Sequence, residues 1–357
     1  MNKYKVCVYA ICKNEEKFVS RWVKSMSEAD EIYVLDTGST DNTVKFLKDL
    51  GVHVKTKIID PWRFDVARNE SLKLVPEDTD ICVCTDLDEI FKPGWRNELE
   101  KVWSKNANRL RFIYNWSLDE NNKPIVSFYY EKTHSRKGYK WIHPVHEILK
   151  YEGKENFILT DNIVLNHYPD NTKSRGSYLK LLELSVKEEP NDDRNMHYLG
   201  REYMYYKKWN KSIDTLIKHL RMPSATWKEE RCASMRFISR CYINLNRFFE
   251  AEMWLLKAIE ECPYIREGYT ELGMLYYSLE KYDKAKFYFE SALKQKENAR
   301  VYINEPFCYD GTIYDYLSIC EYKLGNNKEA IKYAKEVLKY GKDTERIKNN
   351  IKIFESK

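Results

Sequence analysis

Short apolar runs alternate with amphipathic stretches over the first part of the chain, and this alternation limits the possible folds more than any other feature. Apolar runs at residues 6–12, 31–36, 52–58 and 81–85 predict strands. Between them, residues 15–26, 42–50 and 64–74 carry apolar side chains at helical spacing. Strands that alternate with helices are typical of βαβ units in an α/β domain. Ligands bind beyond the carboxyl ends of such strands, which directs attention to the loops at Lys13, Asp36 and Asp86.

A different pattern begins at about residue 194. Four blocks each carry two small residues twelve positions apart: Gly200 and Ser212, Ser239 and Ala251, Gly273 and Ala285, Ser318 and Ala330. Small residues let paired helices approach closely, and Leu216, Leu255 and Phe289 can fill the space between pairs. The pattern resembles the tetratricopeptide repeat, with its period of about 34 residues. It predicts a four-repeat helical solenoid at roughly 190–357; a plain helical bundle is the alternative.

Length and composition indicate two domains and exclude several classes of protein. The 357 residues exceed what one core usually organises, about 250–300 residues. No run approaches the roughly 18 apolar residues that a membrane span needs, and the apolar run at 6–12 is followed at once by acids, unlike a signal peptide. The nine scattered cysteines include no C-x-x-C pair, which favours a cytoplasmic protein. A net charge of +5 is too small to indicate nucleic acid.

Three acids follow the last predicted strand in the stretch ICVCTDLDEIF, residues 81–91. Asp86 and Asp88, two positions apart, would project to the same side if the chain stays extended. Their repulsion would be relieved by a hard cation, Mn²⁺ or Mg²⁺, with positions left open for the phosphates of a nucleoside diphosphate. The alternative is that Asp88 or Glu89 only leads a helix near residues 94–102.

Four segments together resemble the amino-terminal half of family 2 glycosyltransferases of the GT-A fold: VYAICKNEEKFVSRWVKSM, ADEIYVLDTGSTDNT, FDVARNESL and CTDLDEIF. The resemblance covers about residues 4–105 and implies a UDP-sugar donor. It implies that the nucleoside is held by Ile11, Lys13, Glu15 and Asp36, and that Arg68 lies near the pyrophosphate, where its planar charge suits the role. Asp86 and Asp88 would bind the metal and the sugar nucleotide, with Glu89 orienting one of them. A surface ion pair is the other interpretation of Arg68.

The segment YKWIHPVHEILK supplies the candidate catalytic base. Inverting transfer needs a group that takes the proton of the acceptor, and Glu147, beside apolar Trp141 and Ile142, is the first candidate. A structural Glu147 tied to His146 is the alternative, and Asp119 is the reserve. His167 resembles the late histidine that completes the metal site in some GT-A enzymes; a packed histidine before a proline turn is its other interpretation.

These observations predict an α/β GT-A domain at residues 1–187 and an all-α tetratricopeptide-like solenoid at 188–357. The expected function is metal-dependent, inverting transfer of a hexose or N-acetylhexosamine from a UDP-sugar to Ser, Thr or Cys of a peptide or protein that the repeats bind. Some bacterial peptide and protein glycosyltransferases, including S-glycosyltransferases, join these two parts. Transfer to a lipopolysaccharide-type or other surface glycan is the alternative. A non-catalytic scaffold with an inactive front domain is the alternative of another class, and the repeats could also form a homodimer.

Overall fold

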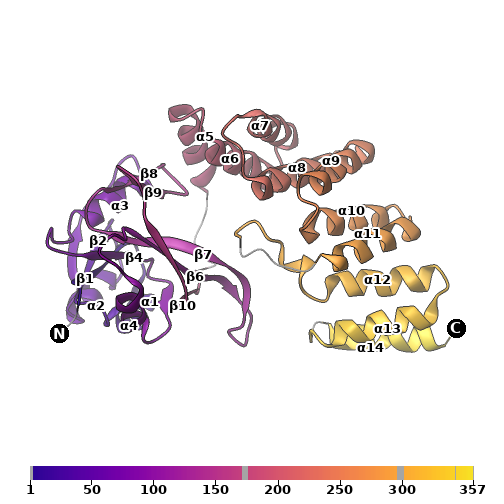
Figure 1. Ribbon diagram of the computed structural model, residues 1–357, viewed down its shortest axis with the longest axis horizontal. Helices are drawn as coiled ribbons and strands as arrows, with labels where there is room; N and C mark the ends of the chain where they lie inside the picture. The colour runs from indigo at the N-terminus through magenta and orange to yellow at the C-terminus, as the bar shows by residue number, and fades with distance from the viewer. Residues whose placement is uncertain (1–2, 171–175, 296–300, 342, 357) are drawn as a thin grey trace. The chain divides into compact units, whose positions relative to one another are not determined.

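The computed structural model describes residues 3–170, 176–295, 301–341 and 343–356 (Figure 1). The chain divides into two compact units, Met1–Ser185 and Val186–Lys357, two residues before the boundary predicted at 187. The first unit is α/β and the second is helical. The fold class predicted from the sequence is therefore confirmed.

The N-terminal unit is built on one mixed sheet. Among the described residues its strands follow the order β3-β2-β1-β4-β7-β6-β10-β5. The strands are β1 Val6–Cys12, β2 Glu31–Asp36, β3 His53–Thr56, β4 Ile81–Cys84, β5 Glu89–Phe91, β6 Arg109–Leu118, β7 Pro124–Ser135 and β10 Phe157–His167. A separate hairpin pairs β8 Tyr139–Ile142 with β9 Ile148–Tyr151. The helices are α1 Glu16–Met26, α2 Thr43–Asp49, α3 Phe64–Leu72 and α4 Trp95–Val102.

The first four strands are parallel, as the alternation predicted. The sheet then departs from a wholly parallel one, because β7 runs antiparallel to both β4 and β6. Strand β10 runs parallel to β6 and antiparallel to the short β5. This second half places residues from the later part of the unit beside the carboxyl end of β4.

The core of this unit explains why β1 and β4 read as continuous apolar runs. A parallel strand covered on both faces buries every side chain, and residues from Val6 to Ala10 are fully buried. Helix α1 contributes Trp22 and Met26, both without exposed surface. Trp22 Nε1 donates to Thr85 Oγ1 at 3.0 Å, so the helix also fixes the point at which β4 ends.

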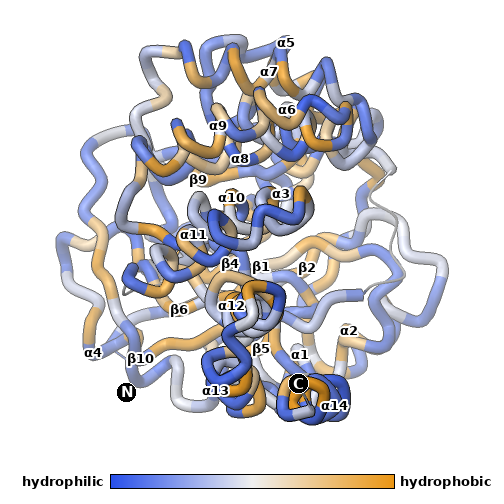
Figure 2. The backbone as a smooth tube through the Cα atoms, turned by 90° about the vertical axis from the view of Figure 1, so that its right-hand side faces the viewer, coloured by the Kyte–Doolittle hydropathy of each residue, from blue (hydrophilic) through white to orange (hydrophobic). Residues whose placement is uncertain are grey.

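The C-terminal unit consists of successive antiparallel helices (Figure 1), along which hydrophobic residues recur between hydrophilic ones (Figure 2). Helix α5 Tyr178–Glu188 spans the division between the units. The following helices are α6 Asp193–Tyr205, α7 Trp209–Arg221, α8 Lys228–Asn244, α9 Phe248–Glu261, α10 Arg266–Ser278, α11 Tyr282–Lys294, α12 Thr312–Lys323, α13 Asn327–Leu338 and α14 Thr344–Glu355. Among the described residues, no helix is both long and apolar enough to cross a membrane.

The small residues of the repeat lie where paired helices meet. Ser212 Oγ donates to the Gly200 carbonyl at 2.8 Å, joining α7 to α6, and Ser239 Oγ donates to the Ala251 carbonyl at 3.0 Å, joining α8 to α9. A Cβ atom at Gly273 would lie 2.7 Å from the Phe289 ring. The spacing in the sequence therefore reflects close helix pairs.

Candidate active site

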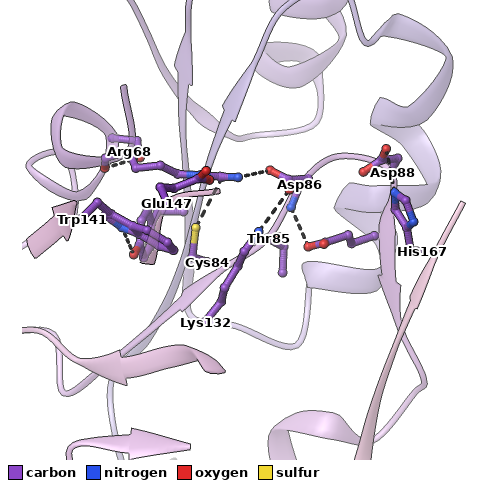
Figure 3. A network of polar contacts seen from close by, with 12 residues as sticks. Arg68, Cys84, Thr85, Asp86, Asp88, Lys132, Trp141, Glu147 and His167 are labelled. Atoms are coloured by element: carbon purple, nitrogen blue, oxygen red, sulfur yellow. Dashed lines mark hydrogen bonds and ion pairs between the residues drawn. The ribbon is translucent and has the colours of Figure 1, made fainter. Parts of the chain in front are cut away.

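Asp86 lies just beyond β4 and is held by two cations. Arg68 Nη2 donates to its Oδ1 at 2.5 Å, and Lys132 Nζ donates to its Oδ2 at 3.2 Å. Figure 3 shows both side chains reaching this carboxylate. Burial alone would raise the pKa of Asp86, but the two cations hold it well below its usual range. Asp86 is therefore a charged group with an ion pair at each oxygen.

Arg68 comes from α3 and is almost completely buried, with 3% of its side chain exposed. Besides Asp86, it donates from Nε to Glu147 Oε1 at 3.0 Å, and its guanidinium lies 5.6 Å from the centre of the Trp141 ring. The alternative considered for Arg68 was an ion pair on the surface. The arginine does form ion pairs, with Asp86 and Glu147, but its side chain is buried. It joins α3, the end of β4 and the turn between β8 and β9.

Glu147 lies in that turn, directly after a residue with unusual backbone. His146 has φ 52, in the left-handed region that side chains other than glycine rarely adopt. The turn presents Glu147 to Arg68, and 12% of the Glu147 side chain is exposed. The carboxylate of Glu147 is thus ion paired with Arg68.

Lys132 was missed in the sequence and belongs to this cluster. It lies on β7, is 8% exposed, and its ammonium sits 4.9 Å from the centre of the Tyr130 ring. Burial would lower the pKa of Lys132, but Asp86, Tyr130 and Glu89 raise it well above its usual value. No sequence motif around Lys132 indicates a functional role. The lysine reaches Asp86 only because β7 pairs antiparallel with β4.

The chain does not stay extended between Asp86 and Asp88. The Glu89 N–H donates to the Asp86 carbonyl at 3.0 Å, which closes a turn, and the two aspartates have different partners. Glu89 itself is buried, and its carboxylate accepts from the Asp86 N–H at 2.8 Å and from Tyr114 Oη at 2.7 Å. Glu89 therefore shapes the turn that carries both aspartates.

Asp88 faces His167, the last residue of β10 (Figure 3). His167 Nε2 lies 3.4 Å from Asp88 Oδ2, and His167 Nδ1 lies 3.0 Å from the Trp116 carbonyl. A carbonyl can only accept, so Nδ1 carries a proton. Burial alone would lower the pKa of His167, but the hydrogen bond to Asp88 raises it, so Nε2 faces the carboxylate as the donor of an ion pair that a metal bound between the two groups would replace. A histidine that donates its other nitrogen to a carbonyl is the usual arrangement of a metal ligand. Asp88 and His167 fit Mn²⁺, which accepts both carboxylate and imidazole.

The loops after β1 and β2 are tied to each other. The Asn14 N–H donates to Ser39 Oγ at 2.9 Å, and Asn14 Oδ1 accepts from the Thr40 N–H at 2.8 Å. Asp36, 1% exposed, accepts from the Ser39 N–H at 3.0 Å and the Gly38 N–H at 3.3 Å. Its carboxylate is therefore turned toward its own loop.

The other predicted nucleoside residues surround this pair of loops. Ile11 is paired with Leu35 across β1 and β2, Lys13 is exposed, and the Glu15 N–H donates to Thr43 Oγ1 at 2.7 Å. The three positions thus frame one edge of the sheet, while Arg68, Asp86 and Glu147 form a separate connected group.

A cavity of about 540 Å³ opens beside His167. Its lining includes Lys17, Phe18, Arg21, Asp119, His167 and Tyr168. Asp119, the reserve base, accepts from the Asn121 and Lys123 N–H groups through Oδ1, both at 2.8 Å, so this oxygen caps the tip of the β6–β7 hairpin. The cavity is lined by aromatic rings and basic groups, next to the Asp88–His167 pair.

Comparisons with known proteins find similar sequences for parts of both units. Residues 7–153 match the family model of glycosyl transferase family 2, and residues 266–357 match that of the prolyl 4-hydroxylase peptide-substrate-binding domain. An uncharacterized glycosyltransferase of Rickettsia typhi (strain ATCC VR-144 / Wilmington) is 30% identical over 110 residues, 30% of this chain and 36% of the relative. One of Rickettsia bellii (strain RML369-C) is 30% identical over 107 residues, 29% of this chain and 35% of the relative. The matches thus span about a third of these relatives.

Solved structures similar to the chain include MamA and a TPR protein, both at low identity. MamA is 19% identical with a TM-score of 0.39, over 50% of this chain and 99% of MamA. A thermophilic TPR protein of Thermus thermophilus is 18% identical with a TM-score of 0.37, over 49% of this chain and 90% of that protein. Residues 7–153, which match glycosyl transferase family 2, thus lie in the α/β unit, and a tetratricopeptide-like helical unit follows.

Proposed function

We propose that this protein transfers a hexose or N-acetylhexosamine, with inversion and with the aid of a divalent metal, from a UDP-sugar to a Ser, Thr or Cys side chain of a peptide or protein. The observation that carries the proposal is the Asp88–His167 pair, in which the hydrogen bond to the Trp116 carbonyl turns Nε2 of the imidazole toward a carboxylate.

Asp88 and His167 would hold the metal, Mn²⁺ or Mg²⁺, with Mn²⁺ favoured by the imidazole ligand. Asp86 was also a predicted metal ligand, but both its oxygens are ion paired; we assign it instead to positioning the two cations. When bound, the metal offsets negative charge on the diphosphate as it leaves.

Arg68 and Lys132 would bind the diphosphate. Both are buried cations at the end of β4, where a low dielectric strengthens their attraction for phosphate oxygens. Asp86 keeps both cations in place before the donor arrives. Ile11, Lys13, Glu15 and Asp36 would hold the nucleoside along the neighbouring loops.

Glu147 remains our candidate base. In the transfer step the acceptor oxygen or sulfur forms a bond to the anomeric carbon, the bond from that carbon to the diphosphate oxygen breaks, UDP departs, and Glu147 takes the acceptor proton. Arg68 would orient the carboxylate through Oε1. Asp119 is the weaker candidate, because its Oδ1 is committed to a turn.

A peptide or protein acceptor is supported by the match of residues 266–357 to a peptide-substrate-binding domain. A lipopolysaccharide-type or other surface glycan is the alternative acceptor, and the cavity beside His167, with its aromatic rings, could take a sugar. A homodimer through the helical unit is compatible with either acceptor. A scaffold without activity is a further outcome, which the following experiment separates from a transferase.

The test incubates the full chain with a panel of UDP-sugars, with and without Mn²⁺, and measures hydrolysis and UDP binding. Peptide and glycan acceptors are then added and examined by intact mass spectrometry. We expect metal-dependent turnover and a mass increase of one sugar on peptides. If only glycans are modified, the acceptor is a surface glycan and not a peptide. If neither turnover nor metal-dependent UDP binding is found, the protein is a scaffold without activity.

A further inference from the structure

Two fully buried histidines of the helical unit share one serine. His197 lies on α6, His219 on α7 and Ser234 on α8, and none has exposed surface. Ser234 Oγ lies 2.7 Å from His197 Nδ1 and 2.9 Å from His219 Nδ1. The serine therefore fixes both rings by the same nitrogen.

The other nitrogen of each ring is buried without a hydrogen bond. Neither His197 Nε2 nor His219 Nε2 has a hydrogen-bond partner among the described residues. Native proteins rarely leave buried polar atoms in this condition, and each such atom calls for a ligand, water or ion. A cation bound between the two rings would give both nitrogens a partner.

A carboxylate completes the cluster. Glu230, one turn before Ser234 on α8 and 3% exposed, places Oε1 3.5 Å from His219 Nε2. One ring nitrogen of each histidine and a carboxylate oxygen of Glu230 all lie within 4.8 Å of one another. Tyr302 Oη donates to Glu230 Oε2, which fixes the carboxylate as Ser234 fixes the rings.

The proton positions suit a cation. Ser234 Oγ has two lone pairs, so it can accept from both Nδ1–H groups at once, and both Nε2 atoms then carry lone pairs. An imidazole that presents a lone pair in this way can bind a metal.

We propose that His197, His219 and Glu230 form a structural zinc site that links α6, α7 and α8. Two imidazole nitrogens and one carboxylate oxygen suit Zn²⁺, whereas Mg²⁺ and Ca²⁺ prefer oxygen ligands. Ser234 supplies the outer hydrogen bonds that orient both rings. This site is separate from the Asp88–His167 pair and does not depend on the proposed transferase activity.

The test compares zinc content in three forms of the full chain after dialysis with limiting Zn²⁺. We expect about one equivalent in the wild type and in Asp88→Asn/His167→Gln, which lacks the other candidate metal pair, and none in His197→Gln/His219→Gln. We also expect Zn²⁺ to raise the Tm of the wild type and of Asp88→Asn/His167→Gln, but not that of His197→Gln/His219→Gln. Equal zinc content in all three forms, or no zinc in the wild type, would overturn the proposal.

Two further measurements keep the test decisive if the histidine double variant does not fold. Co²⁺ added to metal-free Asp88→Asn/His167→Gln should give the intense visible absorption of a tetrahedral site, and the weak spectrum of an octahedral ion would contradict the assignment. Ser234→Ala keeps all three ligands and removes the outer hydrogen bonds. It should weaken zinc binding about 10–100-fold, and unchanged affinity would show that the serine does not orient a metal site.

Discussion

The ring of His167 lies face to face with the indole of Trp116, with ring centres 4.6 Å apart and planes 24° from parallel. The same tryptophan provides the carbonyl that accepts from His167 Nδ1. The Trp116 carbonyl and the Trp116 indole thus both hold the His167 ring in place. A substitution of Trp116 removes the stacked indole and keeps the carbonyl.

Trp116→Ala should weaken Mn²⁺ binding by about threefold to tenfold, less than the 10–100-fold expected when an outer-shell hydrogen bond is lost. Isothermal titration with Mn²⁺ measures the effect. Phe157→Ala, at an exposed position on β10, is the control and should leave the affinity unchanged. An equal loss in both variants would assign the effect to the sheet and not to the stacked ring.

Asp88→Asn should abolish metal-dependent UDP binding and lower turnover at least 100-fold, because one of the two proposed metal ligands loses its charge. UDP binding is titrated with and without Mn²⁺. Asp78→Asn provides a matched change at a side chain that is 73% exposed, and it should behave as the wild type. Retained Mn²⁺ dependence in Asp88→Asn would remove Asp88 from the metal site.

Lys132→Met should raise the KM for the UDP-sugar about tenfold or more, since a buried cation near the diphosphate is lost and a tenfold change corresponds to about 1.4 kcal/mol. Asp86 keeps Arg68 as its partner in this variant. Lys140→Met, where the side chain is 53% exposed, is the control. If Lys132→Met leaves KM and the affinity for UDP unchanged, Lys132 pairs with Asp86 but does not bind the diphosphate.

The first half of the N-terminal unit could be predicted closely because its signals are local. The predicted strand at 31–36 matches β2, and the predicted helix at 15–26 begins one residue later as α1. Lys132 could not be found in this way, because its partner Asp86 is 46 residues away and is reached only through sheet pairing.

The two aspartates show a second limit of sequence reasoning. Their spacing suggested a shared direction, but the hydrogen bond between Glu89 and Asp86 bends the chain. The side chains then meet different partners from α3, β7 and β10. The spacing in the sequence singled out Asp86 and Asp88. Only the tertiary contacts show that Asp86 pairs with Arg68 and Lys132, whereas Asp88 pairs with His167.

Gly273→Ala tests the close pairing of α10 and α11. Alanine favours the helix by about 1 kcal/mol over glycine, but its Cβ would lie 2.7 Å from the Phe289 ring, and overpacking costs about 1–3 kcal/mol. We expect a net loss of stability in chemical denaturation. Phe289→Leu in the same chain should recover part of the loss, and two purely additive effects would argue against the contact.

The pH dependence of stability should report His134, which is buried on β7. Its Nε2 accepts from Tyr9 Oη at 2.7 Å, and burial lowers its pKa from 6.5 to about 3. Below pH 6.5 the unfolded chain binds a proton at His134, whereas the folded chain binds it only near pH 3. The contribution of neutral His134 to the free energy of unfolding is therefore complete above pH 6.5. It decreases by about 1.4 kcal/mol for each unit that the pH falls within this window.

His134→Gln should therefore flatten the fall in unfolding free energy of the N-terminal unit between pH 6.5 and 4, measured by denaturant titration at each pH. The exposed His53 supplies the control, and His53→Gln should keep the slope of the wild type. Identical slopes in all three proteins would mean that His134 takes up its proton without unfolding.

The register that sets His167 opposite Glu89 joins the end of β10 to the beginning of β5. Residues of the turn at Asp86–Glu89 leave the ribosome long before His167, so a nascent chain that ends before residue 157 carries one half of the metal pair and none of the strand that holds the other. Closing this long loop is slow compared with forming local contacts. A metal held by Asp88 and His167 would therefore bind only after β10 has joined the sheet beside β5.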